Sequence, residues 1–111
     1  GFVSHLPHVM AFSAMQAANE LDQMLDEDVF TFAGGSFMDL TRIAGGDPDM
    51  WRDIFLTNKD SILAACSLFS SKMDELKTLI ENESVEEIHQ FVNTAHKIKV
   101  EKFPHQENET K

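Results

Sequence analysis

The sequence predicts an all-α fold, a helical bundle of five to six helices. Three observations support this prediction. The length of 111 residues is that of a single domain, and apolar residues recur at spacings of three and four along most of the chain. Four of the five glycines form two pairs and there are only three prolines, so most of the chain lacks helix breakers. No segment stands out as a strand.

The first apolar row predicts a helix from about Ser4 to Leu25. Ser4 is a suitable N-cap, and Pro7 is expected in the first turn, where its missing N–H costs little. The acidic cluster at residues 26–28 ends the pattern. The members of the row are Leu6, Met10, Ala14, Ala17, Leu21 and Met24.

Two pairs of glycines bound a short helix predicted over residues 37–44. Gly34 and Gly35 precede it in a loop, where they provide backbone dihedrals that other residues avoid. Gly45 and Gly46 stop it. The chain is therefore expected to turn on both sides of this helix.

Asp47 and Pro48 give a strong signal for the start of the next helix. Asp47 can act as the N-cap, and Pro48 suits the first helical position. This helix is expected to break near Asn58 or to continue. Its buried side carries Trp51, Ile54 and Phe55.

Two further helices are predicted in the second half of the chain. A heptad-like row suits packing along another helix: Ile62, Cys66, Phe69, Met73, Leu76 and Ile80. Cys66 is expected to be a buried small hydrophobe. Ser84 and Glu87 match a capping box that begins the last helix. The helical domain is expected to cover residues 1–103, and residues 104–111 form a polar tail.

The net charge of −10 argues against partners that need a basic surface. Nineteen acidic residues outnumber nine Lys and Arg, so neither nucleic acid nor a membrane surface is an expected partner. No apolar run reaches the roughly 18 residues of a membrane span, and no secretory signal is visible. The lone Cys66 cannot form an intramolecular disulfide, which fits a reducing compartment and a cytoplasmic location.

Two strings carry a resemblance to a known family. They are SHLPH at residues 4–8 and AGGSFMDLTRIAGGDPDMWRDIF at residues 33–55. Together they resemble the C-terminal domain of the prephenate dehydrogenase family, whose fold is similar to the C-terminal domain of 6-phosphogluconate dehydrogenase. The resemblance implies NAD- or NADP-dependent oxidative decarboxylation of prephenate to 4-hydroxyphenylpyruvate in tyrosine biosynthesis. An arogenate dehydrogenase would share these strings.

The resemblance also implies what lies elsewhere in such an enzyme. The family's catalytic histidine and its dinucleotide loop belong to an N-terminal Rossmann domain, and this chain has no G-x-G-x-x-G motif. We therefore expect no catalytic residue, no bound cofactor and no metal site in the chain. It begins at Gly1 without a Met, and we expect a fragment that is inactive alone and forms a homodimer.

Arg42 matches the family's substrate-binding arginine, which the resemblance assigns to the ring carboxylate of prephenate. A guanidinium suits this role because it stays charged and can make two parallel bonds to a carboxylate. Spacing alone favours another role, a surface ion pair with Asp39 three residues earlier.

His5 and His8 are three residues apart and project from similar sides of a helix N-terminus, which itself favours an anion. The resemblance places a substrate-contacting histidine in SHLPH. We favour His8 for this contact and expect His5 to support it. Without the resemblance, packing or capping is the favoured role of either histidine.

Gly35 and Trp51 complete the predicted substrate site. Gly34 and Gly35 match the family's glycine-rich turn, whose backbone approaches the substrate, although Ser36 stands where a third glycine is common. Simple loop glycines are the alternative. Trp51 matches a tryptophan that in relatives lies near the active site of the partner subunit, but a core position is favoured over direct contact.

Two hypotheses about function remain. The chain is either the substrate-binding and dimerising part of an enzyme, or a purely structural helical dimerisation module. The heptad-like row fits both hypotheses. Arg42, His8 and Gly35 favour the enzyme, because a dimerisation module would not require them.

Overall fold

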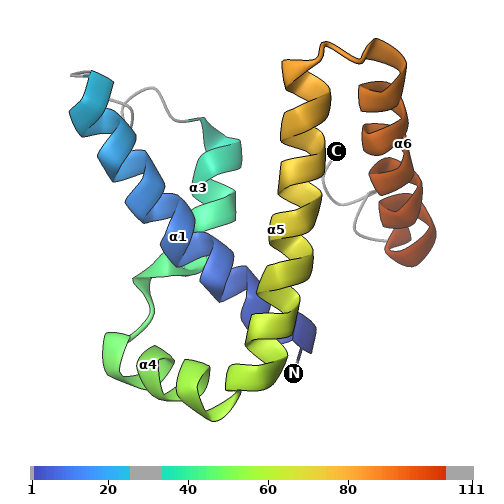
Figure 1. Cartoon of the computed structure of the whole chain (residues 1–111). Helices are drawn as coiled ribbons and strands as arrows, with labels where there is room; N and C mark the ends of the chain where they lie inside the picture. The colour runs from blue at the N-terminus through green and yellow to red at the C-terminus, as the bar shows by residue number, and fades with distance from the viewer. Residues whose placement is uncertain (1, 26–33, 105–111) are drawn as a thin grey trace. The chain divides into compact units, whose positions relative to one another are not determined.

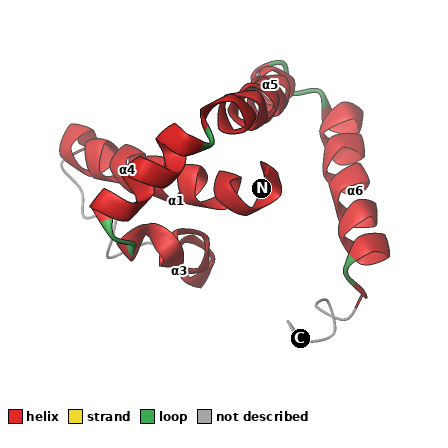
Figure 2. Cartoon of the chain, turned by 90° about the horizontal axis from the view of Figure 1, so that it is seen from below, coloured by secondary structure: helices red, strands yellow, loops and turns green. Residues whose placement is uncertain are grey.

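Every element that the structure describes is helical, in a computed structural model covering residues 2–25 and 34–104. The elements are α1 (Phe2–Leu25), α3 (Gly35–Thr41), the 3₁₀ helix η1 (Arg42–Gly45), α4 (Pro48–Thr57), α5 (Lys59–Glu81) and α6 (Val85–Lys102) (Figure 1). Figure 2 likewise shows no strand within these ranges. The predicted all-α class is confirmed. The acidic cluster at residues 26–28 and the tail from residue 105 lie outside the described residues.

The chain divides into two units, Gly1–Leu68 and Phe69–Lys111, and α5 belongs to both. In the first unit, α1 packs against α3 and η1. The most buried side chains of α1 are small, with Ala11 and Ala18 exposed by 0% and 7%. Small side chains let neighbouring backbones approach this face of α1 closely.

The buried face of α1 differs from the apolar row in the sequence. That row includes Leu21 and Met24, which are 44% and 78% exposed, whereas the buried face is centred on Ala11 and Ala18. These alanines are seven residues apart and therefore lie on one side of the helix. The row already contained Ala14 and Ala17, so the predicted face is offset from the buried one: Ala17 is exposed and its neighbour Ala18 is buried.

The start of α1 also differs from the prediction. The helix already includes Phe2, so Ser4 lies inside it, and the prediction of Ser4 as N-cap is wrong. Pro7 is consequently the sixth residue of the helix and not part of its first turn. The missing N–H of Pro7 leaves the carbonyl of Val3 without its usual intrahelical donor.

The helix predicted over residues 37–44 begins two residues earlier than expected, at Gly35. Gly34 is the N-cap of α3 with φ −83° and ψ 178°, and Gly35 is the first residue of the helix. No glycine of the described ranges has a positive φ, so the expectation of special dihedrals here is wrong. At the other end, the hydroxyl of Thr41 donates to the carbonyl of Phe37 at 2.8 Å, and the chain continues as η1.

The signals at both ends of α4 are confirmed. Asp47 is the N-cap, and its Oδ2 accepts from the backbone N–H of Met50 at 3.0 Å. The helix breaks at Asn58, whose side-chain amide donates to the carbonyl of Ile54 at 2.9 Å. The carbonyl of Asn58 then accepts from the hydroxyl of Ser61 at 3.1 Å, at the start of α5.

The turn between α5 and α6 contradicts the predicted capping box. Glu83 adopts the left-handed region with φ 50°. Its N–H donates to the carbonyl of Ile80 and that of Ser84 to Leu79, both at 3.0 Å, which is a Schellman motif. The Ser84 N–H is thus unavailable to Glu87, and the Ser84 side chain makes no cap hydrogen bond. The C-terminal motif of one helix therefore replaces the N-terminal motif of the next.

Candidate functional site: a histidine–tryptophan stack and an unpaired arginine

Two histidines of α1 contact the single tryptophan of the chain, which lies on α4. The ring of His8 stacks on Trp51 with 3.6 Å between centroids and 19° between planes. His5 meets Trp51 edge-on at 6.2 Å and 78°. Phe12 and Phe55 lie 6.3 and 5.7 Å from the Trp51 ring. We call these five residues the aromatic cluster.

Helix periodicity explains how the aromatic cluster forms. His5, His8 and Phe12 follow one another at spacings of three and four on one face of α1, while Trp51 and Phe55 are four apart on α4. Each ring pair contributes about 0.5–1.5 kcal/mol beyond the area it buries. The start of α4, set by the Asp47 cap, determines which side of that helix carries Trp51.

Ring contacts rather than hydrogen bonds hold the two histidines. The Nδ1 atoms of His5 and His8 are buried and have no hydrogen-bond partner. Within the described residues, no hydrogen bond fixes the orientation of the His8 imidazole. Its orientation therefore depends on the face of Trp51, and of its two ring nitrogens only Nε2 is open to a polar ligand, because Nδ1 is buried.

The edge of the Trp51 indole lies directly against Gly46. An ideal Cβ placed on Gly46 would lie 2.7 Å from Nε1 and 2.8 Å from Cδ1 of the indole. The same construction at Gly34, Gly35 and Gly45 meets nothing within 4 Å. Gly46 is therefore the one glycine of these four at which a side chain would collide with a neighbour.

Arg42 and Arg52 are the two arginines of the chain, and their surroundings differ. The Arg52 guanidinium lies 3.5 Å from a carboxylate oxygen of Asp49 and 3.0 Å from one of Asp53. Arg42 is exposed at the start of η1 and forms no ion pair with any described residue. The pairing of Arg42 with Asp39 that spacing alone favours is thus not observed.

The structure brings together some of the predicted site residues. His5, His8 and Trp51 share the aromatic cluster. Gly35 lies exposed at the start of α3, and Arg42 begins η1; both of these elements pack against α1. No described contact joins Gly35 or Arg42 to the cluster itself.

Two residues of this region, Phe12 and Gly46, were not predicted from the sequence as site residues. Phe12 lies four residues after His8, so helical spacing could have added it to the histidine face. Gly46 was interpreted only as a helix stop. Its contact with Trp51 has no signal in spacing, because it depends on where the indole lies in three dimensions.

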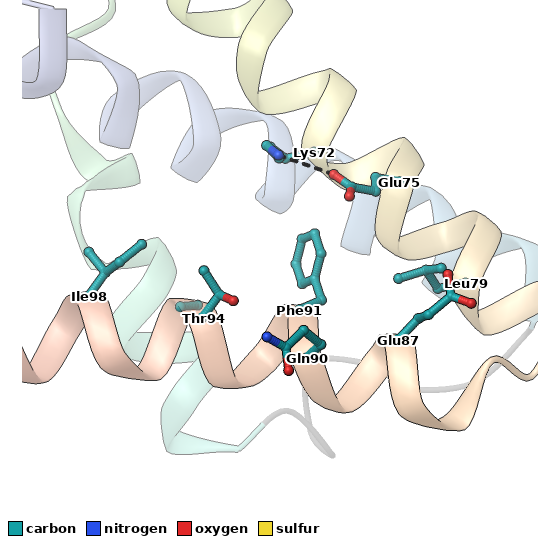
Figure 3. A pocket seen from close by; sticks show the side chains of 9 residues that line it. Lys72, Glu75, Leu79, Glu87, Gln90, Phe91, Thr94 and Ile98 are labelled. Atoms are coloured by element: carbon teal, nitrogen blue, oxygen red, sulfur yellow. Dashed lines mark hydrogen bonds and ion pairs between the residues drawn. The ribbon is translucent and has the colours of Figure 1, made fainter.

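A second candidate surface lies wholly within the second unit. There α5 and α6 run antiparallel (Figure 1) and flank an open groove of roughly 580 Å³. Figure 3 shows Phe91 projecting from α6 towards α5, on which Lys72 and Glu75 form an ion pair at 3.2 Å. The groove is also lined by Leu79, Glu87, Gln90, Thr94, Ala95 and Ile98.

The described residues contain neither a metal-binding cluster nor a membrane-spanning helix. There, no group of three or more His, Cys, Asp or Glu side chains is arranged to hold a metal ion. Of the helices in residues 2–25 and 34–104, none combines the length and apolar character needed to cross a bilayer.

The fold and the aromatic cluster define an all-helical domain with a half-buried histidine pair and an exposed, unpaired arginine. The model of the family described as prephenate dehydrogenase, dimerization domain, matches residues 1–94. The chain belongs to this family.

Individual relatives agree with this assignment. Prephenate dehydrogenase of Bacillus subtilis (strain 168) is 38% identical over 93 residues, which are 84% of this chain and 25% of that protein. Cyclohexadienyl dehydrogenase of Zymomonas mobilis is 31% identical over 80 residues, 72% of this chain and 27% of that protein. The crystal structure of prephenate dehydrogenase from Aquifex aeolicus matches with a TM-score of 0.79 at 36% identity, covering 89% of this chain and 34% of that one. The chain spans about a quarter of the length of these curated relatives.

Proposed function

We propose that this chain supplies the substrate-carboxylate site and the dimer contact of a cytoplasmic prephenate dehydrogenase. Such an enzyme converts prephenate to 4-hydroxyphenylpyruvate by oxidative decarboxylation, with NAD or NADP as hydride acceptor, in tyrosine biosynthesis. Residues 1–103 act as the helical domain for both tasks. The relatives that match the chain, named as prephenate and cyclohexadienyl dehydrogenases, support this function over a purely structural module.

The unpaired guanidinium of Arg42 is the observation that carries the proposal. In a chain with a net charge of −10, carboxylates are abundant, yet no described carboxylate pairs with this arginine. An anionic ligand therefore meets a cation that is not already neutralised. Prephenate carries two carboxylates, and a guanidinium can bind one of them through two parallel hydrogen bonds.

The other site residues have defined parts in the proposal. His8 offers its Nε2 to the substrate, His5 supports it, and the backbone at Gly35 approaches the substrate closely. Trp51 acts as the platform for His8 rather than as the main contact. These roles rest on the ring contacts of the aromatic cluster and on the family's strings at residues 4–8 and 33–55.

The described residues do not fit a dinucleotide cofactor. A nicotinamide dinucleotide is bound where a strand leads through a glycine-rich turn into a helix. All described elements are helical, and the chain has no G-x-G-x-x-G motif. We therefore place the nicotinamide outside the residues of this chain and derive no hydride step from them.

Replacement of Arg42 by alanine in the full-length dehydrogenase tests the substrate role. Loss of a charge-assisted carboxylate contact of about 1.5–3 kcal/mol raises KM for prephenate roughly ten- to several-hundred-fold, with a smaller change in kcat. Steady-state kinetics measures both parameters.

Arg52→Ala is the matched control. It removes the same charge from an exposed arginine that is already paired with Asp49 and Asp53. Exposed ion pairs contribute little to stability. We expect its KM to stay within about three-fold of the parent value. An unchanged KM in Arg42→Ala, or equal effects in both variants, contradicts the proposed carboxylate site.

The dimer role is supported by the surface of the second unit. None of the described residues from 69 to 104 is buried. Large apolar side chains of this unit remain more than half exposed, among them Met73, Ile80, Val92 and Ile98. Apolar surface of this extent marks an interaction site, and a second copy of the chain is the partner that a dimerization domain implies.

A further inference from the structure

The contact between Gly46 and Trp51 has a consequence for the substrate site. Trp51 is held from several sides: His8 covers one face at 3.6 Å, and the rings of His5, Phe12 and Phe55 lie at 6.2, 6.3 and 5.7 Å. A further constraint is Gly46, whose missing side chain leaves room for the Nε1 and Cδ1 edge. The indole therefore has little freedom to move away from that edge without disturbing the histidines.

The requirement for glycine at this position is steric and not conformational. Gly46 has φ −67° and ψ 160°, which any L-residue adopts without strain. An alanine could thus take this backbone, but its Cβ would lie 2.7 Å from the indole nitrogen. The indole of Trp51 would have to shift to make room for this Cβ, and His8 stacks on that indole.

We propose that Gly46 is a positioning residue of the substrate site: it seats the edge of Trp51 so that the indole face holds His8 in its binding orientation. The imidazole has no hydrogen bond to the described residues that could hold it independently. A displacement of the indole is therefore transmitted to His8. The substrate part of this inference rests on the proposed function, whereas the packing part does not.

Gly45 provides a matched control in the neighbouring position. A Cβ on Gly45 meets nothing within 4 Å, and Gly45 has no positive φ. Gly45→Ala therefore makes the same chemical change to the same segment without touching Trp51. Both substitutions reduce the conformational freedom of the unfolded chain to a similar extent.

The first measurement is the proton NMR spectrum of the histidine rings in the 111-residue chain. Ring protons of His8 lie over the indole face and are shifted upfield by its ring current; His8→Gln identifies them. Gly46→Ala is expected to abolish this upfield shift, and Gly45→Ala to preserve it. Preservation of the shift in Gly46→Ala overturns the inference.

The second measurement is kinetic and uses the full-length dehydrogenase. Because Gly46 acts through His8, KM for prephenate is expected to rise in Gly46→Ala by up to roughly ten-fold, the effect of losing the His8 hydrogen bond, with kcat less affected. Gly45→Ala is expected to leave both parameters unchanged. If Gly46→Ala abolishes the His8–Trp51 stack but leaves KM unchanged, Gly46 is not a positioning residue. This outcome would overturn the inference even if Arg42→Ala raised KM as expected. If Arg42→Ala has no effect, the proposed function fails, but the NMR result still decides the packing.

A double variant keeps the inference testable if Gly46→Ala folds poorly. Phenylalanine at position 51 lacks the pyrrole edge that faces Gly46, so Gly46→Ala is expected to be tolerated in the Trp51→Phe background. Thermal denaturation of the parent, the two single variants and the double variant measures this coupling. Additive effects of the two substitutions contradict a direct collision.

Discussion

At the scale of single residues, the two histidines of α1 differ in how they meet Trp51. His8 stacks on the ring face, whereas His5 approaches its edge at a centroid distance of 6.2 Å. The stacked ring has its plane fixed, and a fixed imidazole pays less entropy when it binds a ligand. This difference supports His8 over His5 as the substrate contact.

The preference for His8 can be measured with His8→Gln and His5→Gln in the full-length dehydrogenase. Loss of one hydrogen bond of about 1–1.5 kcal/mol raises KM for prephenate roughly ten-fold in His8→Gln. His5→Gln is its control and is expected to stay within about three-fold, because that ring only abuts the edge of Trp51. A larger effect of His5→Gln would exchange the roles of the two histidines.

The sequence predicted which residues to examine at this scale but not their contacts. The strings at residues 4–8 and 33–55 led to His5, His8 and Trp51, which the structure joins in one cluster. More than forty residues separate the histidines from Trp51, so no spacing rule relates them. The part played by Gly46 could not be predicted, because it depends on the position of an indole edge.

At the scale of elements, the turn between α5 and α6 contains a local strain. Glu83 is the only non-glycine residue of the described ranges with a positive φ, at 50°. This conformation costs an L-residue about 1–2 kcal/mol, and glycine is the usual choice at this place in a Schellman motif. The strain persists because the hydrogen bonds from Glu83 and Ser84 close the end of α5.

Glu83→Gly is therefore expected to stabilise the chain. Glycine relieves the backbone strain of the folded state but also increases the conformational entropy of the unfolded chain. The net gain in the free energy of unfolding is about 0.5–1 kcal/mol, which raises Tm by roughly 2–8 °C. Thermal denaturation followed by circular dichroism measures the change. Glu83→Ala removes the same carboxylate but keeps the strain, and an equal gain in that variant would exclude strain as the cause.

Local signals predicted both ends of α4 correctly. Asp47, Pro48 and Asn58 each act through neighbours within four residues, and the structure confirms them. The capping box at Ser84 failed because α5 and α6 both require the same backbone N–H. A capping motif in the sequence describes only one helix end. It does not show whether the Ser84 N–H bonds to the end of α5 or to the start of α6.

At the scale of the whole molecule, the described chain buries few large side chains. Among the described residues only Ala11, Ala18, Ile62 and Ala65 are buried apolar residues. The predicted heptad-like row is buried only at its start. Ile62 is buried and Cys66 half-buried, whereas Met73 and Ile80 are 58% and 56% exposed. The sequence predicted an apolar row; periodicity does not show whether the same chain or a partner covers it.

We expect Phe91→Asp to weaken the proposed homodimer. Phe91 lines the groove between α5 and α6, within the unit that we propose as the dimer contact. A carboxylate buried in such a contact costs at least about 2 kcal/mol, or roughly a thirty-fold higher dimer Kd. Sedimentation equilibrium at micromolar concentration measures this constant. Far-UV circular dichroism must show the parent's helix content, so that dissociation is not confused with unfolding of α6.

Val92→Asp is the comparison for the dimer test. Val92 is the next residue on α6, is 56% exposed and does not line the groove. We expect its dimer Kd to change less than that of Phe91→Asp. Dissociation by Val92→Asp with an intact Phe91→Asp dimer would move the interface to the other side of α6.

The His8–Trp51 stack also makes the protein its own reporter. The chain has one tryptophan and no tyrosine, so emission excited at the indole band arises from a single known position. That indole contacts the imidazole proposed to meet the substrate. Ligand titrations can therefore be followed optically without a label, and the signal comes from the proposed binding region rather than from an average over the molecule.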